Sequence, residues 1–396
     1  MPNPGVSPQE AERRTEIVQR HIAQGYGWMS RAARELEMDR TTLQSWCKKF
    51  GLRADGPETH IAEGFALKGY SEFTKTEHGT PIWLKTVKAE QDYWKGVAEA
   101  IAAIRPVTDV PLPTGLPDGD IIPWLQIGDA HIGMLASEAE TGANFDIGIG
   151  EREICAAAAA LIDAAPPCRR MVINDLGDAS HYETFRGETE ASGHALDFDT
   201  RYWKMIRAYI RITQFIVERA LGKAETVDYI CNQGNHSRSN DIWMAATIDA
   251  LYGETGRVNV LKNESPFIAY RMGKTLVVIH HGDKAKPERF RDVVISDFAA
   301  DWGETDFHYL DGGHVHHSQR KELAGCLFES WNNLAPRDKY AHDGGWRSKQ
   351  CMTLVLRSRT YGEVGRHVMP IERVRDLILA TGKAHYVPPQ MRAFAA

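Results

Sequence analysis

The stretch that decides the fold is IIPWLQIGDAHIG, residues 121–133. Its first half, Ile121 to Ile127, is a short and mostly apolar run that is typical of a buried strand. Asp129 and His131 follow two positions apart, so they lie on the same side of the chain wherever the extended backbone continues. We therefore expect a strand that carries a carboxylate and an imidazole to one edge of a sheet.

The same arrangement recurs four times further along the chain. Each time a short apolar segment ends in glycine and a group of polar residues: RRMVINDLGDASH (169–181), VDYICNQGNHS (227–237), TLVVIHHGD (275–283) and FHYLDGGHVHH (307–317). These segments supply Asp178 with His181, Asn235 with His236, His280 with His281 and Asp283, and His314 with His316 and His317. Sharp turns in such loops are allowed by the adjacent glycines Gly128, Gly177, Gly234, Gly282 and Gly313.

A single strand-end Asp or His is more often a turn cap or a satisfied polar residue than a metal ligand. Five such groups in series favour a different interpretation, because side chains from separate strand ends can converge on one rim of a sheet. Carboxylate, amide and imidazole groups together form a donor set that suits divalent cations. The sequence thus predicts an α/β domain with a metal centre.

Taken in order, GDAHIG, LGDASH, GNH, HHGD and GHVH resemble the DxH, GD, GNH, HG and GHxH blocks of calcineurin-like metallophosphoesterases. The resemblance implies an αββα sandwich for residues 120–375 and phosphoester hydrolysis with two divalent metal ions. Manganese is the favoured metal, and the mixed donor set also accepts iron or zinc.

The same resemblance implies which residues hold the metals. One ion would be bound by Asp129, His131, Asp178 and His316, and the other by Asp178, Asn235, His281 and His314. Asp178 would then bridge the two ions. His236 would face the scissile phosphate as a general acid or charge stabiliser without binding metal.

Two positions depart from the family pattern. Ser237 follows the GNH block where an acidic residue is common, which leaves open how His236 is oriented. The fourth block contains two adjacent histidines, and His281 is preferred over His280 because it precedes Gly282 as in the family.

The GD block continues to His181, and this GDxxH form resembles the nuclease subunit that partners an SMC-like ATPase in the bacterial SbcCD complex. It implies that His181 helps to position the terminal nucleotide of a DNA strand. An SMC-like ATPase would be a candidate partner, although no other feature of the sequence supports one. The polar insertion from His181 to Met205 is either a substrate-side loop or a plain solvated connection.

The N-terminal region, Gln9 to Leu52, has the apolar spacing of three helices. Ser30 is expected to cap a helix that ends at Met38, and Asp39 to cap a helix from Arg40 to Phe50. On this last helix the buried stripe would be Leu43, Trp46, Cys47 and Phe50. The outward face would carry Arg40, Thr41, Gln44, Ser45, Lys48 and Lys49.

The segment RAARELEMDRTTLQSWCKKFG resembles the helix-turn-helix of recombinases, transposases and phage regulators. The resemblance implies that the six outward residues contact DNA, with base-reading side chains flanked by phosphate-binding ones. The alternative is a small helical domain used for protein contacts or dimerisation. Together with the phosphoesterase blocks, this domain is typical of phage or prophage gene content.

Composition and spacing divide the chain into four parts. Residues 1–55 form the small all-α domain, and residues 56–119 form an adaptor with a pair of short strands, an amphipathic helix over 83–104 and a linker rich in proline and glycine. Residues 120–375 form the phosphoesterase domain. Residues 376–396 form a C-terminal tail.

Charge and cysteine usage limit the remaining functions. The formal net charge of −6 argues against wrapping of nucleic acid by the whole chain, so any DNA affinity must be local. Six scattered cysteines without a CxxC pair fit a reducing cytoplasm. No signal peptide, membrane segment or membrane association is expected, and the choice between monomer and homodimer is left open.

The favoured function is hydrolysis of DNA phosphodiesters. A phosphatase or cyclic-nucleotide phosphodiesterase with a regulatory helical domain is the alternative enzyme. A DNA-binding regulator with an inactive phosphoesterase body is the third option, and it is disfavoured because every expected ligand position holds a competent residue type.

Overall fold

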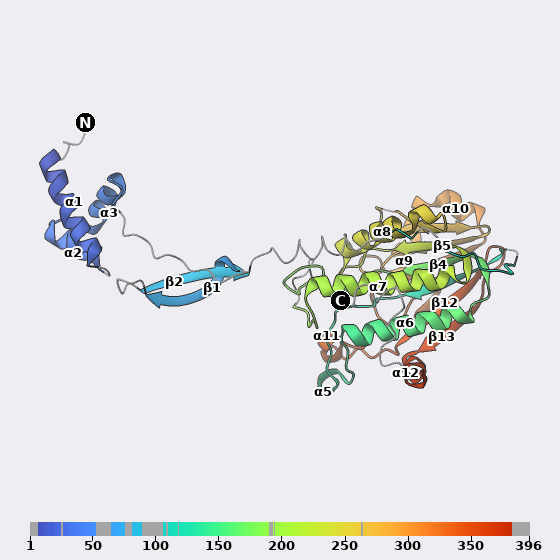
Figure 1. The fold of residues 1–396 in the computed structure, drawn as a ribbon. Helices are drawn as coiled ribbons and strands as arrows, with labels where there is room; N and C mark the ends of the chain where they lie inside the picture. The colour runs from blue at the N-terminus through green and yellow to red at the C-terminus, as the bar shows by residue number, and fades with distance from the viewer. Residues whose placement is uncertain are drawn as a thin grey trace. The chain divides into compact units, whose positions relative to one another are not determined.

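The computed structural model describes residues 7–24, 27–52, 65–75, 81–88, 106–107, 110–117, 119–189, 193, 195–262 and 264–381. The chain divides into two compact units, residues 1–95 and 96–396, and each is described by itself (Figure 1). Among the described residues, no helix is both long enough and apolar enough to cross a membrane.

A six-stranded sheet forms one layer of the larger unit, with the order β13-β12-β3-β4-β5-β6. Its parallel part consists of β3 (Ile121–Ile127), β4 (Cys168–Asp175), β5 (Ala224–Cys231) and β6 (Val258–Val260). Antiparallel strands β12 (Cys351–Ser358) and β13 (Gly362–Pro370) complete the other side of β3.

A five-stranded sheet forms the second layer, with the order β10-β11-β9-β8-β7. It contains β7 (Ile268–Met272), β8 (Thr275–Ile279), β9 (Phe307–Gly312), β10 (Gln319–Leu323) and β11 (Cys326–Ser330). The pairs β8·β9 and β9·β11 are parallel. The carboxyl ends of β8 and β9 therefore lie at the same edge of this sheet.

Alternation along β8 shows how the layers pack. Val277 and Ile279 face the first sheet and share a buried core with Trp124 and Val355, whereas Leu276 and Val278 face outward. That outward face is covered by Phe290 of α9 (Pro287–Asp297), which is followed by α10 (Ala299–Glu304). Both faces of β8 are thus buried, which requires a layer on each side of the sheet.

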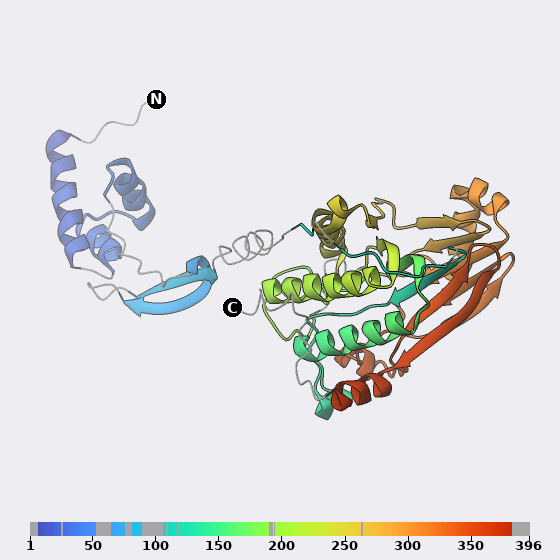
Figure 2. The same cartoon turned by 45° about the vertical axis from the view of Figure 1, so that its right-hand side comes forward.

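Helices cover the outer face of the six-stranded sheet. They are α6 (Ile147–Ala164), α7 (Tyr202–Leu221), α8 (Arg238–Tyr252) and α12 (Ile371–Ala380). Helices α6 and α7 lie side by side in both views (Figures 1 and 2). The shorter elements are α5 (Glu138–Thr141), α11 (Lys339–Asp343) and a 3-10 turn over Gly253–Thr255. The predicted αββα sandwich is confirmed.

A buried ion pair ties the two sheets together. Arg357 of β12 donates two hydrogen bonds to Asp311 of β9, at 3.0 and 2.9 Å, and both side chains are 1% exposed. The guanidinium lies between the rings of Trp124 and Tyr309, at 4.8 and 5.0 Å from their centroids. Asp311 lies two residues before Gly313, so the Arg357–Asp311 ion pair adjoins the loop that carries His314.

Two segments of the larger unit differ from the sequence expectation. The proline-rich stretch before β3 was expected to be a linker, but Val107 donates to the carbonyl of Leu251 at 2.8 Å, and Arg257 donates to the carbonyl of Val110 at 2.7 Å. Helix α12 runs through Asp376, where the tail was expected to begin, because its buried face starts at Ile371 and Val374 and the helix continues to Ala380.

The N-terminal unit contains the three expected helices, α1 (Pro8–Ala23), α2 (Trp28–Glu35) and α3 (Arg40–Lys49). Asp39 is confirmed as the N-cap of α3, because it accepts a hydrogen bond from the backbone N–H of Thr42 at 2.8 Å. The expectation for Ser30 was wrong. The N-cap of α2 is Gly27, three residues earlier, whose φ of +80° stops the helix from extending backwards, and the helix ends at Glu35 instead of Met38.

The buried stripe of α3 is shorter than expected. Leu43, Trp46 and Cys47 pack with Val18 and Ala33, as predicted, but Phe50 is 46% exposed. Phe50 is the C-cap residue, so its side chain leaves the helix face and lies against Trp46, with ring centroids 4.6 Å apart. The six predicted DNA-contacting residues are all exposed.

The expected strand pair forms β1 (Phe65–Lys75) and β2 (Pro81–Lys88), which are antiparallel, with Phe73 opposite Trp83. Trp83 to Lys88 were expected to begin a helix and instead continue β2. Thr86 and Val87 are β-branched residues that favour a strand over a helix. The rest of the expected helix lies outside the described residues.

Candidate metal centre

The strand order brings the five predicted ligand loops together. Parallel strands β3, β4 and β5 lead into the loops that carry Asp129, Asp178 and Asn235, and β8 and β9 lead into those of His281 and His314. Parallel neighbours place their carboxyl ends at one edge of a sheet. Because the two sheets pack face to face, both edges contribute to one rim.

The first cluster on this rim joins Asp129, His131 and His316. Their donor atoms all lie within 4.8 Å of one another. The Nε2 atoms of His131 and His316 are 3.0 Å apart, and His316 Nε2 is 3.5 Å from Asp129 Oδ1. Asp129 is fully buried, and the carboxylate raises the pKa of His316 above its usual value although burial opposes this.

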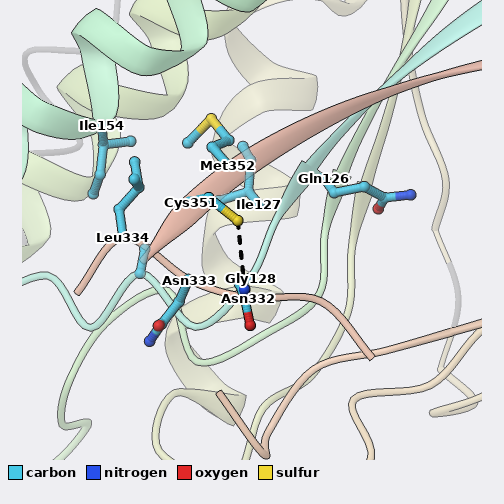
Figure 3. A pocket seen from close by; sticks show the side chains of 10 residues that line it. Gln126, Ile127, Gly128, Ile154, Asn332, Asn333, Leu334, Cys351 and Met352 are labelled. Carbon is cyan, nitrogen blue, oxygen red and sulfur yellow. Dashed lines mark hydrogen bonds between the residues drawn. The ribbon is translucent and has the colours of Figure 1, made fainter. Parts of the chain in front are cut away.

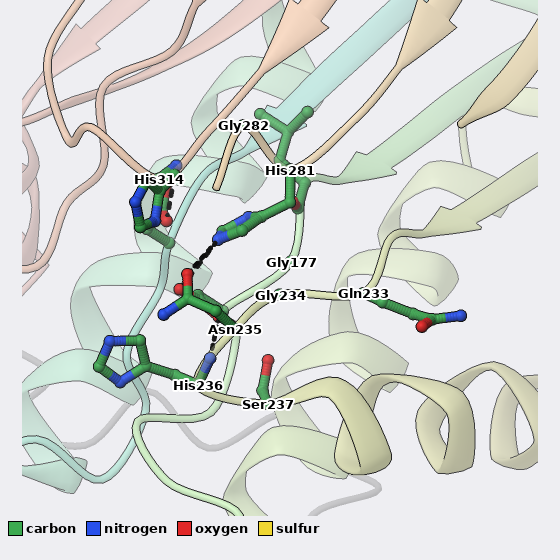
Figure 4. A network of polar contacts seen from close by, with 12 residues as sticks. Gly177, Gln233, Gly234, Asn235, His236, Ser237, His281, Gly282 and His314 are labelled. Atoms are coloured by element: carbon green, nitrogen blue, oxygen red, sulfur yellow. Dashed lines mark hydrogen bonds and ion pairs between the residues drawn. The ribbon is translucent and has the colours of Figure 1, made fainter. Parts of the chain in front are cut away.

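The second cluster joins Asp178, His281 and His314. His281 Nε2 lies 3.0 Å from Asp178 Oδ2 and 3.1 Å from Asn235 Oδ1. Figure 4 shows Asn235 and His281 pointing toward one another, with His314 beside them. Each cluster contains three of the four ligands expected for one ion, and a third group, His131 with His181 and His236, was not expected as a set of ligands. The metal-binding role of each residue stays a prediction.

Backbone conformation marks the same residues. Among the described residues, six that are not glycine have a left-handed φ, and five of them are predicted ligands: Asp129 (+32°), His131 (+43°), Asp178 (+55°), His314 (+67°) and His316 (+52°). A side chain in this region costs free energy, and such residues concentrate at functional sites. The loops thus hold strained conformations where their donor atoms face the rim.

The predicted role of the flanking glycines is only partly correct. Gly177 and Gly282 have positive φ and form sharp turns as expected. Gly234 and Gly313 are needed for close approach instead. A Cβ on Gly234 would lie 2.0 Å from Asp178 Oδ1, and one on Gly313 would lie 2.9 Å from Asp129 Oδ2.

The hydrogen bonds of His281 show whether a cation fits the second cluster. Its Nδ1 donates to the carbonyl of Leu176 at 2.9 Å, so the neutral ring keeps a lone pair on Nε2, facing two oxygen acceptors. Burial alone would lower the pKa of His281, but Asp178 raises it to about 10. The cluster therefore favours a positive charge at this point, and a divalent cation fits it.

Asp178 belongs to the second cluster, and its role as a bridge between two ions stays a prediction. Burial would raise the pKa of its carboxyl group, yet His281 and the other imidazoles hold that pKa well below its usual range. Its Oδ1 accepts the backbone N–H of His236 at 2.7 Å, and its Oδ2 faces His281. The carboxylate is thus ionised and held within the second cluster, while its charge raises the pKa of His316 in the first.

His236 lies beside the rim with one ring nitrogen already used. Its Nδ1 is 3.0 Å from the carbonyl oxygen of His181, which can only accept, so Nδ1 carries the hydrogen. The ring is 4.9 Å from that of His131, centroid to centroid. His236 Nε2 is therefore the atom that can accept or deliver a proton.

Ser237 takes part in a hydrogen-bond network that holds the loop of the GNH block, residues 234–236. Ser237 Oγ donates to Asp241 Oδ2 at 2.5 Å, and the same oxygen accepts the N–H of Gly234 at 3.0 Å. An acidic group thus braces the loop, but it comes from the first turn of α8 rather than from the position after His236.

His181 is placed deeper than its predicted role requires. It is 1% exposed, and its Nδ1 lies 3.1 Å from Nδ1 of His131. Burial lowers its pKa to about 3, so the ring is neutral at ordinary pH. His181 contacts a predicted ligand from behind, and its role toward a nucleotide stays a prediction.

The remaining histidines of the five segments point elsewhere. His280 stacks on Phe267, with centroids 4.4 Å apart, and its Nδ1 accepts the N–H of Gly282. His317 is exposed, with its Nδ1 near the carbonyl of Val315. The geometry agrees with the preference for His281 over His280.

Sequence reasoning missed several residues that support the ligand loops. Asn333 donates to the carbonyl of Asp129 at 3.1 Å, and Asp175 accepts the N–H of Gly177 at 3.1 Å. No motif marks either residue, because each acts through a backbone group rather than through a side chain of the ligand series. The Asn-Asn pair shortly after an apolar strand was the one available signal for Asn333.

A small cavity is lined by residues of β3, β12 and α6 and by Gly128 and Ala130 of the first ligand loop (Figure 3). Its volume of about 10 Å³ is room for about one water molecule. Asn332 lies beside it, with its Nδ2 3.4 Å from Cys351 Sγ. This cavity is too small for a substrate.

No family model and no curated protein matches this sequence. Solved structures with partial likeness include Yfce, a phosphoesterase from E. coli, which is 14% identical over 62% of this chain and 99% of that chain, with a TM-score of 0.30. A conserved protein from Streptococcus pneumoniae TIGR4, described as a predicted phosphoesterase, is 9% identical over 63% and 98%, with a TM-score of 0.25.

Vps29 from Entamoeba histolytica in complex with zinc is 11% identical, over 63% of this chain and 99% of that chain, with a TM-score of 0.23. Likenesses this distant carry no argument about the site. The candidate metal centre stands on the contacts within this chain.

Proposed function

We propose that this chain is a two-metal phosphodiester hydrolase, a DNA nuclease directed by its N-terminal three-helix domain. The observation that carries the proposal is the pair of carboxylate and histidine clusters on one rim, with Asp178 in the second cluster and His236 bonded to it through its backbone. Two divalent ions bound there would polarise a phosphate ester and stabilise its attacking and leaving oxygens.

The residues of the chain prepare the site before substrate arrives. Asp178 contributes negative charge where two cations would otherwise repel each other. The backbone N–H of His236 donates to the carboxylate of Asp178 and keeps that carboxylate from rotating. The carbonyl of Leu176 fixes the ring of His281 so that Nε2 faces the rim. Ligands held this way lose little freedom when a cation binds, which favours binding.

His236 supplies the proton for the leaving oxygen. Because Nδ1 donates to the carbonyl of His181, a protonated ring exposes its second hydrogen on Nε2. Delivery of that hydrogen neutralises the departing alkoxide, and the neutral ring remains held by the same carbonyl. Proton transfer is thus assigned to His236 and metal binding to its neighbours.

The N-terminal unit supports DNA as the substrate. Helix α3 presents Arg40, Gln44, Lys48 and Lys49 on its exposed face, and no acidic residue lies on this helix. Glutamine and arginine can read base edges, and lysines can contact phosphates. This arrangement would bring the hydrolase to DNA although the chain as a whole is acidic.

The test is a comparison of substrates with manganese-loaded protein. We expect cleavage of DNA and of bis(p-nitrophenyl) phosphate, a diester, with slower turnover of p-nitrophenyl phosphate, a monoester. Linear and closed circular DNA assayed side by side separate exonuclease from endonuclease activity. Turnover of the monoester or of a cyclic nucleotide without cleavage of DNA would favour the alternative enzyme, and no turnover of any ester would favour an inactive regulator.

A further inference from the structure

A buried chain of polar groups connects the two loops that carry the predicted bridging ligand and the predicted acid. Asp175 ends β4 and accepts the N–H of Gly177, one residue before Asp178. Asp241 lies in the first turn of α8 and accepts the N–H of Gly234, one residue before Asn235. Each carboxyl group thus holds one of the loops by its backbone.

Tyr209 of α7 joins these two carboxyl groups. Its hydroxyl oxygen is 3.0 Å from Asp175 Oδ2 and 3.2 Å from Asp241 Oδ1. Tyr209 is 1% exposed, Asp175 is 2% exposed and Asp241 is fully buried, so water does not compete for these contacts. The distance between the two ligand loops is therefore set in part by one phenol group.

We propose that Tyr209 and Asp241 are positioning residues that hold Asp178 and Asn235 at the separation that two metal ions require. Asp241 holds the GNH loop at two points, because its Oδ2 accepts hydrogen bonds from the Gly234 N–H and from the hydroxyl of Ser237. The inference rests on the proposed function only in assigning metal to these loops. Tyr209 touches neither a predicted ligand side chain nor the rim, and it acts through Asp175 and Asp241.

The number of hydrogens shared by Tyr209, Asp175 and Asp241 limits which of these groups can donate. The hydroxyl of Tyr209 has one hydrogen, so it can donate to only one of its two carboxyl neighbours. The other contact is a hydrogen bond only if that carboxyl carries a hydrogen itself. Burial raises the pKa of Asp241 well above its usual value, which agrees with a neutral Asp241. Its amide analogue should then reproduce the network.

A matched control lies at the end of the neighbouring helix α8. Tyr252 is also fully buried, and its hydroxyl donates to Glu218 of α7 at 2.9 Å. It lies outside the loops of the rim. Tyr252→Phe and Tyr209→Phe therefore remove the same atom from the same kind of hydrogen bond, and only Tyr209→Phe disconnects the bracing carboxyl groups.

The experiment is calorimetric titration of the full chain with Mn²⁺, together with kcat and KM for a small phosphodiester. We expect Tyr209→Phe and Asp241→Ala to weaken the binding of at least one ion by roughly 10- to 100-fold, as is usual for residues that orient metal ligands. Asp241→Asn should retain most of the affinity. Tyr252→Phe should titrate like the wild type, even if its thermal unfolding midpoint falls as far as that of Tyr209→Phe.

Where activity is measurable, Tyr209→Phe should lower kcat more than it changes KM. The inference is overturned if Tyr209→Phe binds both ions as the wild type does, or if Tyr252→Phe loses as much affinity. A wild-type chain that binds Mn²⁺ but hydrolyses no ester would end the proposed function, and the titration would still decide this inference.

Discussion

Replacement of His236 by alanine separates proton transfer from metal binding. The backbone N–H of His236, which holds Asp178 Oδ1 at 2.7 Å, remains in the variant. The variant removes the hydrogen bond from Nδ1 to the carbonyl of His181 and leaves every residue of the Asp129 and Asp178 clusters in place, although it breaks the third possible ligand group, His131 with His181 and His236. His236→Ala should therefore keep the metal content of the wild type.

The loss of rate should depend on the leaving group. A positioned acid usually contributes about 10²- to 10⁴-fold, which corresponds to roughly 3–5 kcal/mol in the activation barrier. DNA and alkyl diesters release a basic alkoxide and should suffer the full loss in His236→Ala. A nitrophenyl diester releases a stable anion that needs less protonation, so its loss should be smaller.

The assay compares both kinds of diester with metal analysis of the same preparations. His317→Ala is the matched control, because His317 is an exposed histidine beside the site that belongs to neither cluster. Equal losses on both substrates would contradict the role of His236 as an acid. A fall in metal content in His236→Ala would show that the residue is a ligand.

Three further predictions concern other parts of the molecule. The double variant Lys48→Ala, Lys49→Ala should bind DNA more weakly, and the slope of log K against log salt concentration should fall by about one for each lysine that touches a phosphate. Its hydrolysis of a small diester should not change, and loss of that activity would contradict two separate modules. Mn²⁺ binding near pH 8 should release a proton from His281, because its pKa of about 10 lies above that pH. Calorimetry in buffers of different ionisation enthalpy measures the number of protons released, and no release would contradict a protonated metal-free site. Asp311→Ala should lower the free energy of unfolding by about 3–5 kcal/mol because Arg357 is left buried without its partner, and denaturant titration would contradict this with a cost below about 1 kcal/mol.

The sequence was sufficient to predict the rim. Asp129, Asp178 and His314 each follow an apolar strand closely, and parallel strands place such residues at a common edge, so local pattern and fold rules agree. The αββα layers were predicted from the resemblance of the five blocks to a known family, and the two packed sheets with their helices confirm them. These features depend on residues that are neighbours in sequence.

The residues that hold the ligand loops could not be predicted from the sequence, because their hydrogen-bond partners are distant in sequence. Tyr209 lies 34 positions after Asp175 and 32 before Asp241, and its spacing on α7 is that of an ordinary core residue. Phe50 and Ser30 were misplaced for a different reason. Helix ends depend on the φ of single residues such as Gly27, which apolar periodicity does not reveal.

The measurement that tests the central claim most directly is the metal content of Asp178→Ala beside that of the wild type. Asp178 belongs to the second cluster and its charge also acts on His131 and His316 of the first, so its removal would leave two cations without their shared negative ligand. We expect two divalent ions per wild-type chain, fewer than two in Asp178→Ala, and loss of diester hydrolysis in the variant. Two tightly bound ions with full activity in Asp178→Ala would contradict the two-metal mechanism.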